Sequence, residues 1–266
     1  MPPQSAVINV MEKAARKAAR GLRRDFGEVE NLQVSKKGPA DFVSAADLRA
    51  EDVLREELER ARPGYGFLME EAGAIPGADK THRWIVDPLD GTTNFLHGLG
   101  HYAISIALER EGQLVAGLVF DPIKDEIFWG EKGKGAFVNG HRLRVAARGN
   151  LSGSLIATGI PFKGQEGHER TMRELLALTP RVAGIRRFGA ASLDLAYVAA
   201  GRFDGFWEHG LHPWDIAAGI VLVREAGGMV GDMTGRQPFH FALDSILVAN
   251  EALFAPLSAV LTGKAG

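Results

Sequence analysis

The feature that most constrains this chain is a short acidic stretch directly after an apolar run. The run Trp84–Val86 is typical of a buried strand, and Asp87 and Asp90 follow it closely. Pro88 and Gly91 indicate a turn, and the Thr-Thr-Asn that comes next is typical of a helix start. A strand that brings two carboxylates to a helix N-terminus predicts a phosphate site, because the free amides and the dipole there attract anions.

The two carboxylates would repel a phosphate group unless a cation lay between them. Hard divalent cations prefer oxygen ligands, and Mg2+ commonly accompanies phosphates in proteins. The stretch therefore predicts metal-dependent phosphate chemistry. Considered alone, an aspartate pair at this spacing is weak evidence, since aspartates also stabilise ordinary turns.

Composition excludes several other classes of protein. The net charge of −2 gives no broad attraction to nucleic acid. The chain has no cysteine, so disulfides, thiolate zinc sites and cysteine nucleophiles are excluded. No apolar run approaches the roughly 20 residues that span a membrane, and residues 12–24 are too basic for a signal peptide. We therefore expect a cytoplasmic protein that uses neither a membrane nor nucleic acid.

Periodicity predicts an alternation of helices and strands, which is typical of a layered α/β architecture. Helices are predicted at 5–26, 47–62, 168–178, 190–200, 213–226 and 251–262. Strands are predicted at 67–69, 102–109, 113–120, 126–129, 155–158, 185–188, 203–207, 229–231 and 246–248. The length of 266 residues suits a single domain over 1–266, with an N-terminal metal-binding half to about 150 and a C-terminal α/β half from about 151.

Two other segments have competing interpretations. The basic side chains of the N-terminal helix could bind RNA or a membrane, but acidic neighbours favour a solvated helix face. The glycine-rich segment Glu131–Ala136 is similar to a phosphate cradle, but it lacks the Ser or Thr of a P-loop. A hairpin turn is the favoured interpretation of that segment.

The acidic stretch resembles the signature of the inositol monophosphatase family. Three further segments resemble other motifs of that family, in the same order: residues 36–47, 67–73, and 214–219 with 225–228. Four separated motifs in order, spanning roughly residues 5 to 255, are far more specific than one. The pattern is most similar to that of bacterial inositol-1-monophosphatases.

This resemblance implies a fold and a metal site. The fold would be a five-layer αβαβα sandwich of the inositol monophosphatase and fructose-1,6-bisphosphatase type, in a homodimer. Two Mg2+ ions, or three, would serve the reaction, and lithium would inhibit it. Residues that would hold the ions are Glu70, Asp87, the carbonyl of Leu89, Asp90 and Asp215. Taken singly, Asp215 could be a helix cap, Glu70 a surface charge and Asp90 a turn residue.

The resemblance also assigns catalytic residues. Thr92 and Asp47 would orient the attacking water, and Glu70 would act beside them near the third ion. Thr92 could equally cap a helix. Amides of Gly91 and Thr92 would hold the phosphate during in-line attack, without a covalent phosphoenzyme.

The substrate-binding residues implied by the resemblance come mostly from the second half. They are Asp90, Gly91, Thr92, Arg186, Gly189, Ala190, Glu208 and Asp215. Glu208 would accept hydrogen bonds from substrate hydroxyls, and Arg186 would either hold Glu208, reach the substrate or form a structural ion pair. Ala190 and Met69 depart from the family pattern, which has Ser or Thr at the first position and often Gly at the second. Lys36 and Asp41 would position a loop.

The function implied is Mg2+-dependent hydrolysis of myo-inositol 1-phosphate to myo-inositol and phosphate. The same chemistry on histidinol phosphate or a sugar phosphate, such as fructose 1,6-bisphosphate, is an alternative. Another alternative is a second, regulatory role in RNA processing and transcription through association with RNA polymerase.

Overall fold

The computed structural model describes residues 4–26, 34–38, 41–236, 241 and 244–264, and of 34–38 and 41–44 it describes the backbone only. The helices are α1 Ala6–Phe26, α2 Ala45–Ala61, α3 Thr92–Leu96, α4 His168–Leu178, α5 Ala191–Ala199, α6 Pro213–Glu225 and α7 Glu251–Leu261. Short 3-10 turns occupy Leu151–Gly153 and Thr179–Arg181. The side chains of Lys36 and Asp41 lie outside the described part, so the role expected of them stays a prediction.

The strands form three sheets. They are β1 Val34–Gly38, β2 Asp41–Ser44, β3 Gly66–Met69, β4 Gly73–Ile75, β5 His82–Asp90, β6 Ala103–Arg110, β7 Gln113–Asp121, β8 Glu126–Glu131, β9 Gly135–Val138, β10 His141–Arg142, β11 Leu155–Thr158, β12 Gly184–Arg186, β13 Gly205–His209, β14 Met229–Gly231 and β15 Ser245–Ala249. The large sheet has the order β10-β9-β8-β7-β6-β5-β3-β4, and the smaller one β12-β11-β13-β15-β14. Strands β1 and β2 pair with each other.

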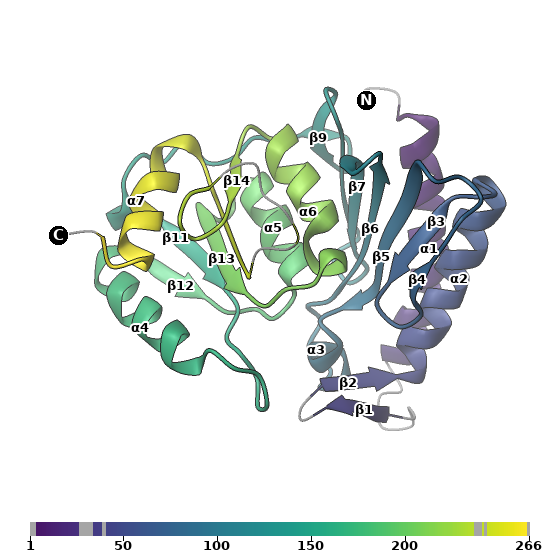
Figure 1. Ribbon diagram of the computed structural model, residues 1–266, viewed down its shortest axis with the longest axis horizontal. Helices are drawn as coiled ribbons and strands as arrows, with labels where there is room; N and C mark the ends of the chain where they lie inside the picture. The colour runs from purple at the N-terminus through teal and green to yellow at the C-terminus, as the bar shows by residue number, and fades with distance from the viewer. Residues whose placement is uncertain (1–3, 27–33, 39–40, 237–240, 242–243, 265–266) are drawn as a thin grey trace.

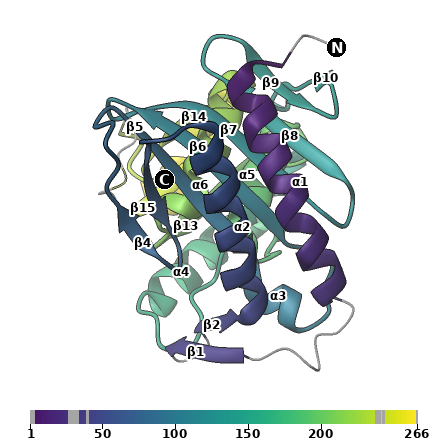
Figure 2. The same ribbon diagram turned by 90° about the vertical axis from the view of Figure 1, so that its right-hand side faces the viewer.

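The helices and the two larger sheets stack in five layers (Figure 1). Helices α1 and α2 cover one face of the eight-stranded sheet, as the turned view shows (Figure 2). Helices α5 and α6 lie between that sheet and the five-stranded one, whose outer face α4 and α7 cover (Figure 1). Separate hydrophobic clusters fill the spaces between these layers. The predicted αβαβα sandwich is therefore confirmed.

Most predicted elements are present within one or two residues of the expected bounds. The hairpin of β6 and β7 turns at Glu111 and Gly112, whose φ angles of 51° and 75° suit a tight hairpin turn. Strand β8 pairs with β9 through the turn that follows Glu131, as expected. Strands β1, β2, β4, β9 and β10 were not predicted, and each has five residues or fewer. Among the described residues, no helix combines the length and apolar character needed to cross a bilayer.

The turn expected at Pro88 is a correction. Strand β5 continues through Pro88 to Asp90, and its register against β6 is irregular between Asp87 and Asp90. Proline lacks the amide that a regular ladder needs, so it is tolerated where pairing is interrupted by a bulge. The chain turns only at Gly91, whose φ of 93° suits glycine. The two aspartates therefore stand on a bulged strand end, which aims them in a fixed direction.

The glycine-rich turn after β8 binds a carboxylate of the protein itself. Gly133 and Gly135 donate their amides to the two oxygens of Glu225, over 2.9 and 2.8 Å. This occupies the amides that a phosphate would need. The turn therefore ties β8 and β9 to α6.

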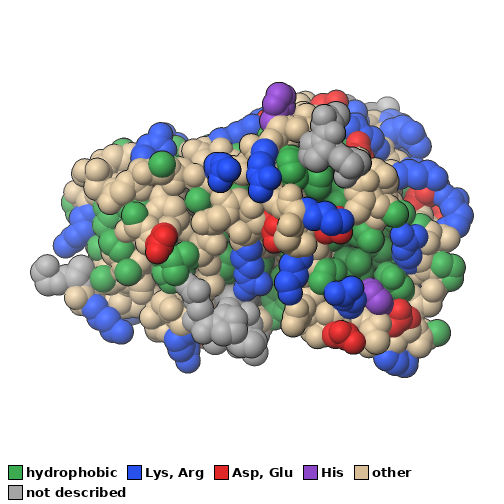
Figure 3. Space-filling model, turned by 90° about the horizontal axis from the view of Figure 1, so that it is seen from above, with side chains coloured by type: hydrophobic (Ala, Val, Ile, Leu, Met, Phe, Trp, Pro, Cys, Tyr) green, Lys and Arg blue, Asp and Glu red, His purple; other side chains and the backbone are tan. Residues whose placement is uncertain are grey.

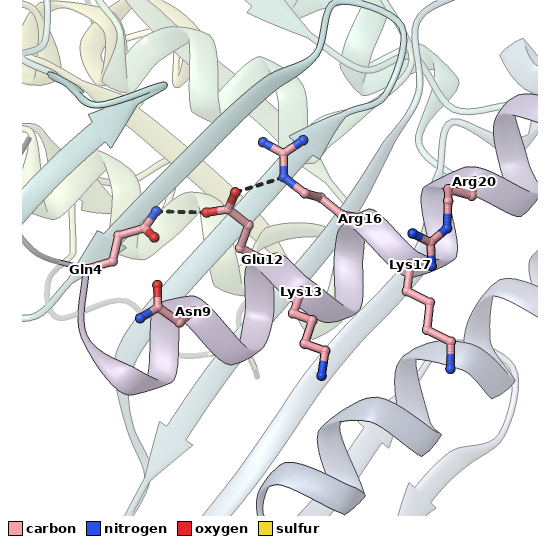
Figure 4. A pocket seen from close by; sticks show the side chains of 7 residues that line it. All are labelled: Gln4, Asn9, Glu12, Lys13, Arg16, Lys17 and Arg20. Atoms are coloured by element: carbon pink, nitrogen blue, oxygen red, sulfur yellow. Dashed lines mark hydrogen bonds and ion pairs between the residues drawn. The ribbon is translucent and has the colours of Figure 1, made fainter.

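Four basic side chains of α1 line a shallow groove together with Gln4, Asn9 and Glu12, and they are Lys13, Arg16, Lys17 and Arg20 (Figure 4). Glu12 accepts hydrogen bonds from Gln4 and from Arg16, the second over 2.8 Å. Lys17 pairs with Glu57 of α2 over 2.7 Å. Seen from above, Lys and Arg side chains are spread over the face, with acidic side chains beside several of them (Figure 3). Local ion pairs therefore offset much of the positive charge of α1.

The close approach of α6 to the large sheet gives a test of the packing. A Cβ on Gly117 of β7 would lie 2.6 Å from the carbonyl oxygen of Ala218 and 2.9 Å from its Cα. Because both contacts are with backbone, Gly117→Ala should destabilise the fold by about 1–3 kcal/mol. We expect a drop of about 3–10 °C in the thermal midpoint, followed by circular dichroism. Gly149→Ala is the control, since a Cβ there meets nothing within 4 Å. Equal midpoints for the two variants would contradict the close packing.

Candidate active site

A cleft of about 460 Å³ opens where the bulged end of β5 faces the five-stranded sheet and the N-termini of α5 and α6. Most of the predicted site residues line it: Glu70, Asp90, Gly91, Thr92, Gly189, Ala190, Glu208 and Asp215. They come from widely separated parts of the sequence. The fold thus brings the phosphate-binding and substrate-binding candidates to one cavity.

Three other predicted residues lie just behind the cleft wall. Asp87 is buried and accepts the amide hydrogen of Leu89 over 2.9 Å. The carbonyl of Leu89 lies 3.0 Å from the Thr92 hydroxyl, and Asp47, fully buried on α2, lies 2.9 Å from the same hydroxyl. Thr92 is therefore the group that connects this buried layer to the cleft.

The acidic residues of the cleft are desolvated and close enough to repel one another. Burial raises the pKa of Asp87 well above its usual range, and the charges of Glu70, Asp90 and Asp215 add to this effect. Burial likewise raises the pKa of Asp215, with Asp90 as the largest charge contribution. Burial raises the pKa of Asp90 to about 6, although hydrogen bonds from Ser192 oppose the change. In water-poor surroundings these carboxylates favour protonation, or a cation that offsets their charge.

The donor set suits a hard divalent cation. Every side-chain donor is a carboxylate oxygen, and the Leu89 carbonyl lies beside them. Within the described part of the chain, no three His, Asp or Glu side chains already stand in the compact arrangement of a metal-ligand set. The negative charges of these carboxylates repel one another, and a cation between them would offset that repulsion.

Helix α2 positions the site in two ways. Asp47 reaches Thr92, and Glu51, one turn further along, accepts the amide hydrogens of Glu71 and Ala72, each over 2.9 Å. These bonds fix the turn that follows β3 and carries Glu70. Sequence reasoning missed Glu51. Its spacing of four from Asp47 was the available signal, because it places both carboxylates on one helix face.

The N-termini of α5 and α6 hold two of the carboxylates. One oxygen of Asp90 accepts both the amide and the hydroxyl of Ser192, over 2.7 and 2.5 Å. Asp215 stands in the first turn of α6 and accepts the amide of His212 over 2.7 Å, in a capping box. The N-cap is His212, so Asp215 is not the N-cap considered from the sequence but the third-position partner of the capping box, and this bond uses only one of its oxygens. Sequence reasoning gave Ser192, the second residue of α5, no role of its own.

The arginine beside Glu208 is Arg187, not the Arg186 expected from the sequence. Arg186 ends β12, is not among the residues that line the cleft, and donates to the carbonyl of Ile185 over 3.0 Å. Arg187 lines the cleft, and its charge opposes the burial that raises the pKa of Glu208 to about 8. Neighbouring residues near a strand end point to opposite sides, so a choice between two adjacent arginines could not be made without the strand's register.

The two departures from the family pattern have simple structural settings. Met69 is fully buried in the core between α1, α2 and the large sheet. Its side chain adds apolar packing at a position where the family often has glycine. Ala190 is buried at the N-cap of α5 and provides no side-chain cap. Asn94 of α3 holds this segment by donating to the carbonyls of His101 and Phe188, each over 2.8 Å.

Comparison with known proteins assigns the chain to a family. Residues 4–262 match the sequence model of the inositol monophosphatase family. The chain belongs to this family. The inositol-1-monophosphatase of Mesorhizobium japonicum is 58% identical over 252 residues, which cover 94% of either chain. The family and the phosphatase class predicted from the four motifs are therefore confirmed.

Two further relatives carry another name. The Nus factor SuhB of Escherichia coli K12 is 43% identical over 229 residues, or 86% of either chain. The crystal structure of the extragenic suppressor protein suhB from Bartonella henselae is 56% identical and has a TM-score of 0.93. It matches 97% of this chain and 98% of its own. This inositol monophosphatase family member is thus also similar to proteins named as a Nus factor and as an extragenic suppressor.

The raised pKa values predict how the stability of the metal-free protein depends on pH. Folded Asp90 and Glu208 titrate near 6 and 8, above the usual 3.8 and 4.5, so the folded state binds more protons between these limits. The free energy of unfolding should therefore fall as pH rises from about 4 to about 8. Thermal midpoints in a chelator across this range would measure the fall, and Mg2+ should reverse part of it at the upper end. A stability that rises steadily over the same range would contradict the desolvated cluster.

Removing one buried charge should stabilise the metal-free protein. Asp87→Asn keeps an acceptor for the Leu89 amide and removes a carboxylate that its neighbours repel, so its midpoint near pH 8 should rise by about 2–6 °C. Asp204→Asn is the matched control, because Asp204 is equally buried but pairs with Arg148 over 3.0 Å. That variant should lose stability instead. A lower midpoint for both variants would argue against repulsion at Asp87.

Proposed function

We propose that this protein is a Mg2+-dependent phosphomonoesterase that hydrolyses myo-inositol 1-phosphate to myo-inositol and phosphate. The observation that carries the proposal is the division of the cleft. Carboxylates with raised pKa values crowd the wall formed by β5 and α6, and Glu208 stands with Arg187 in the part formed by the smaller sheet. The first region suits a metal-bound phosphate and the second suits hydroxyl groups.

The metal ligands proposed are those expected from the sequence. Glu70, Asp87 and the carbonyl of Leu89 would hold one Mg2+, and Asp87, Asp90 and Asp215 a second, with a weaker third ion near Glu70. When bound, Mg2+ would lower the pKa of a coordinated water and neutralise the phosphoryl oxygens. The hydrogen bonds that tie Asp90 to Ser192 and Asp215 to His212 would keep these oxygens in place.

Thr92 and Asp47 would orient the attacking water. Asp47 is fully buried and accepts the hydroxyl hydrogen of Thr92, so the lone pairs of Thr92 remain free to accept a hydrogen from water in the cleft. Gly91 and Thr92 would hold the phosphate with their amides at the first turn of α3, as the glycine's left-handed backbone allows a close approach. These groups position the reactants and leave the expelled alcohol on the Glu208 side.

Glu208 and Arg187 would bind the alcohol part. Burial raises the pKa of Glu208 to about 8, and the oxygens of its carboxyl group can accept hydrogen bonds from substrate hydroxyls. Arg187 takes over the role expected of Arg186, because it is the arginine that lines the cleft. Gly189 and Ala190 would shape the wall beside the ester oxygen. A cleft of about 460 Å³ suits a small monophosphate.

A second, regulatory role is also proposed, on the likeness to the Nus factor relatives. It would involve association with RNA polymerase alongside the phosphatase activity. The homodimer, the cytoplasmic location and inhibition by lithium remain proposals of the same kind. Retention of polymerase binding by Asp87→Asn, tested by co-purification, would separate this role from catalysis.

The catalytic proposal is tested by phosphate release from a panel of small esters with and without Mg2+. Inositol 1-phosphate should be preferred, and Asp87→Asn should abolish the Mg2+-dependent activity. A preference for histidinol phosphate or a sugar phosphate would keep the mechanism and replace the substrate. Hydrolysis that persists unchanged in a chelator or in Asp87→Asn would overturn the mechanism.

The proposed role of Thr92 has its own matched test. Thr92→Val removes the hydroxyl that bonds Asp47 and should lower kcat by about 10²–10³ with little change in KM. Thr93→Val makes the same chemical change at the next position of α3, on an exposed side chain that also lines the cleft but to which no role is assigned. It should stay within about threefold of wild type. Similar losses in both variants would indicate damage to α3 instead of a missing hydroxyl.

A further inference from the structure

We propose that Gly159 is a positioning residue that sets selectivity for polyol phosphates by seating the carboxyl group of Glu208. The inference rests on the proposed function and concerns the part of the cleft that binds the alcohol. It is carried by the packing of two segments of the smaller sheet.

The space where a side chain at position 159 would lie is filled by Glu208. Gly159 directly follows β11, whose last residue Thr158 pairs with Trp207 of β13, next to Glu208. A Cβ built on Gly159 would overlap Oε1, Cδ and Oε2 of Glu208. Because Gly159 has no side chain, this space is the seat in which the carboxyl group of Glu208 lies.

Shape and charge hold the Glu208 carboxyl there. Within the part of the chain that the structure describes, no donor forms a hydrogen bond to it, in contrast to Asp90 and Asp215. Arg187 attracts it and Asp90 repels it. A group held in this way takes its position from the surface behind it, which is the backbone of Gly159.

A side chain at position 159 would move Glu208 and leave the fold intact. Gly159 does not have a positive φ, so alanine meets no backbone strain there. The overlapping atoms are the end of a flexible side chain, and both residues line the cleft. The displaced carboxyl must therefore turn into the space that substrate hydroxyls would use.

The consequence differs between classes of ester. A polyol phosphate presents hydroxyls near the ester and depends on where Glu208 stands. An aryl phosphate such as p-nitrophenyl phosphate has no hydroxyl for Glu208 and uses chiefly the phosphate end of the cleft. The ratio of kcat/KM for the two esters therefore reports the position of Glu208, and general damage to the enzyme would lower both values.

The test is a double-mutant cycle on the full chain with Mg2+, using inositol 1-phosphate and p-nitrophenyl phosphate. Gly159→Ala should raise KM for inositol 1-phosphate at least about tenfold, with kcat/KM for the aryl ester within about threefold. In the Glu208→Ala background the seat is empty, so adding Gly159→Ala should change neither ester by more than about twofold. Gly149→Ala, at a glycine with open space around it, is the control.

Two results would overturn the inference. One is an equal loss on both esters in Gly159→Ala, and the other is an undiminished effect of that change in the Glu208→Ala background. The double variant also removes the overlap, so it remains informative even if Gly159→Ala alone folds poorly, which the thermal midpoint would show. Phosphate release by the wild-type protein from the panel of small esters tests the proposed function separately. If wild type prefers another hydroxylated ester, the cycle is run on that ester with the same expectations.

Discussion

The active-site cleft depends on one constraint: several carboxylates are held close together and away from water, and the fold prevents them from moving apart. Each is tied through one oxygen: Asp87 to the Leu89 amide, Asp90 to Ser192, and Asp215 to the His212 amide. The ties come from three different elements, so moving one carboxylate away from the others would break a hydrogen bond or shift a helix. Their repulsion therefore lowers the stability of the folded protein, and a cation in the cleft would offset this destabilisation.

The middle layer decides the distance across the cleft. Helix α6 carries Asp215 and lies so close to β7 that Gly117 meets its backbone at Ala218. The carbonyl of Trp214 also accepts a hydrogen bond from Ser105 of β6 over 3.2 Å. The separation between Asp215 and the end of β5 thus follows from how a helix packs on a sheet. The packing of α6 therefore also determines the geometry of the site, since a shift of α6 would displace Asp215.

The sequence predicted the site residues that a local pattern marks. It did not predict those whose role depends on contacts with distant parts of the chain. The bulged end of β5 stood out because an apolar run precedes Asp87 and Asp90. Glu51 and Ser192 did not, since their partners lie 20 and 102 residues away in the chain. Arg187 was confused with its neighbour because a shift of one residue reverses the side of a strand. The alternation of strands and helices predicted a layered α/β architecture, whereas the five-layer sandwich followed from the resemblance to the family.

The two ends of the cleft differ in how their acidic groups are held, and this difference has a consequence for specificity. At the phosphate end, hydrogen bonds to backbone and to Ser192 fix one oxygen of each carboxylate, as suits a reaction that tolerates little displacement. At the alcohol end, Glu208 rests against a glycine and is directed by the charge of Arg187. Such a group can be moved by a single substitution beside it without disturbing the fixed end. The reaction and the choice of substrate are therefore separable in this fold, because different physical forces set them.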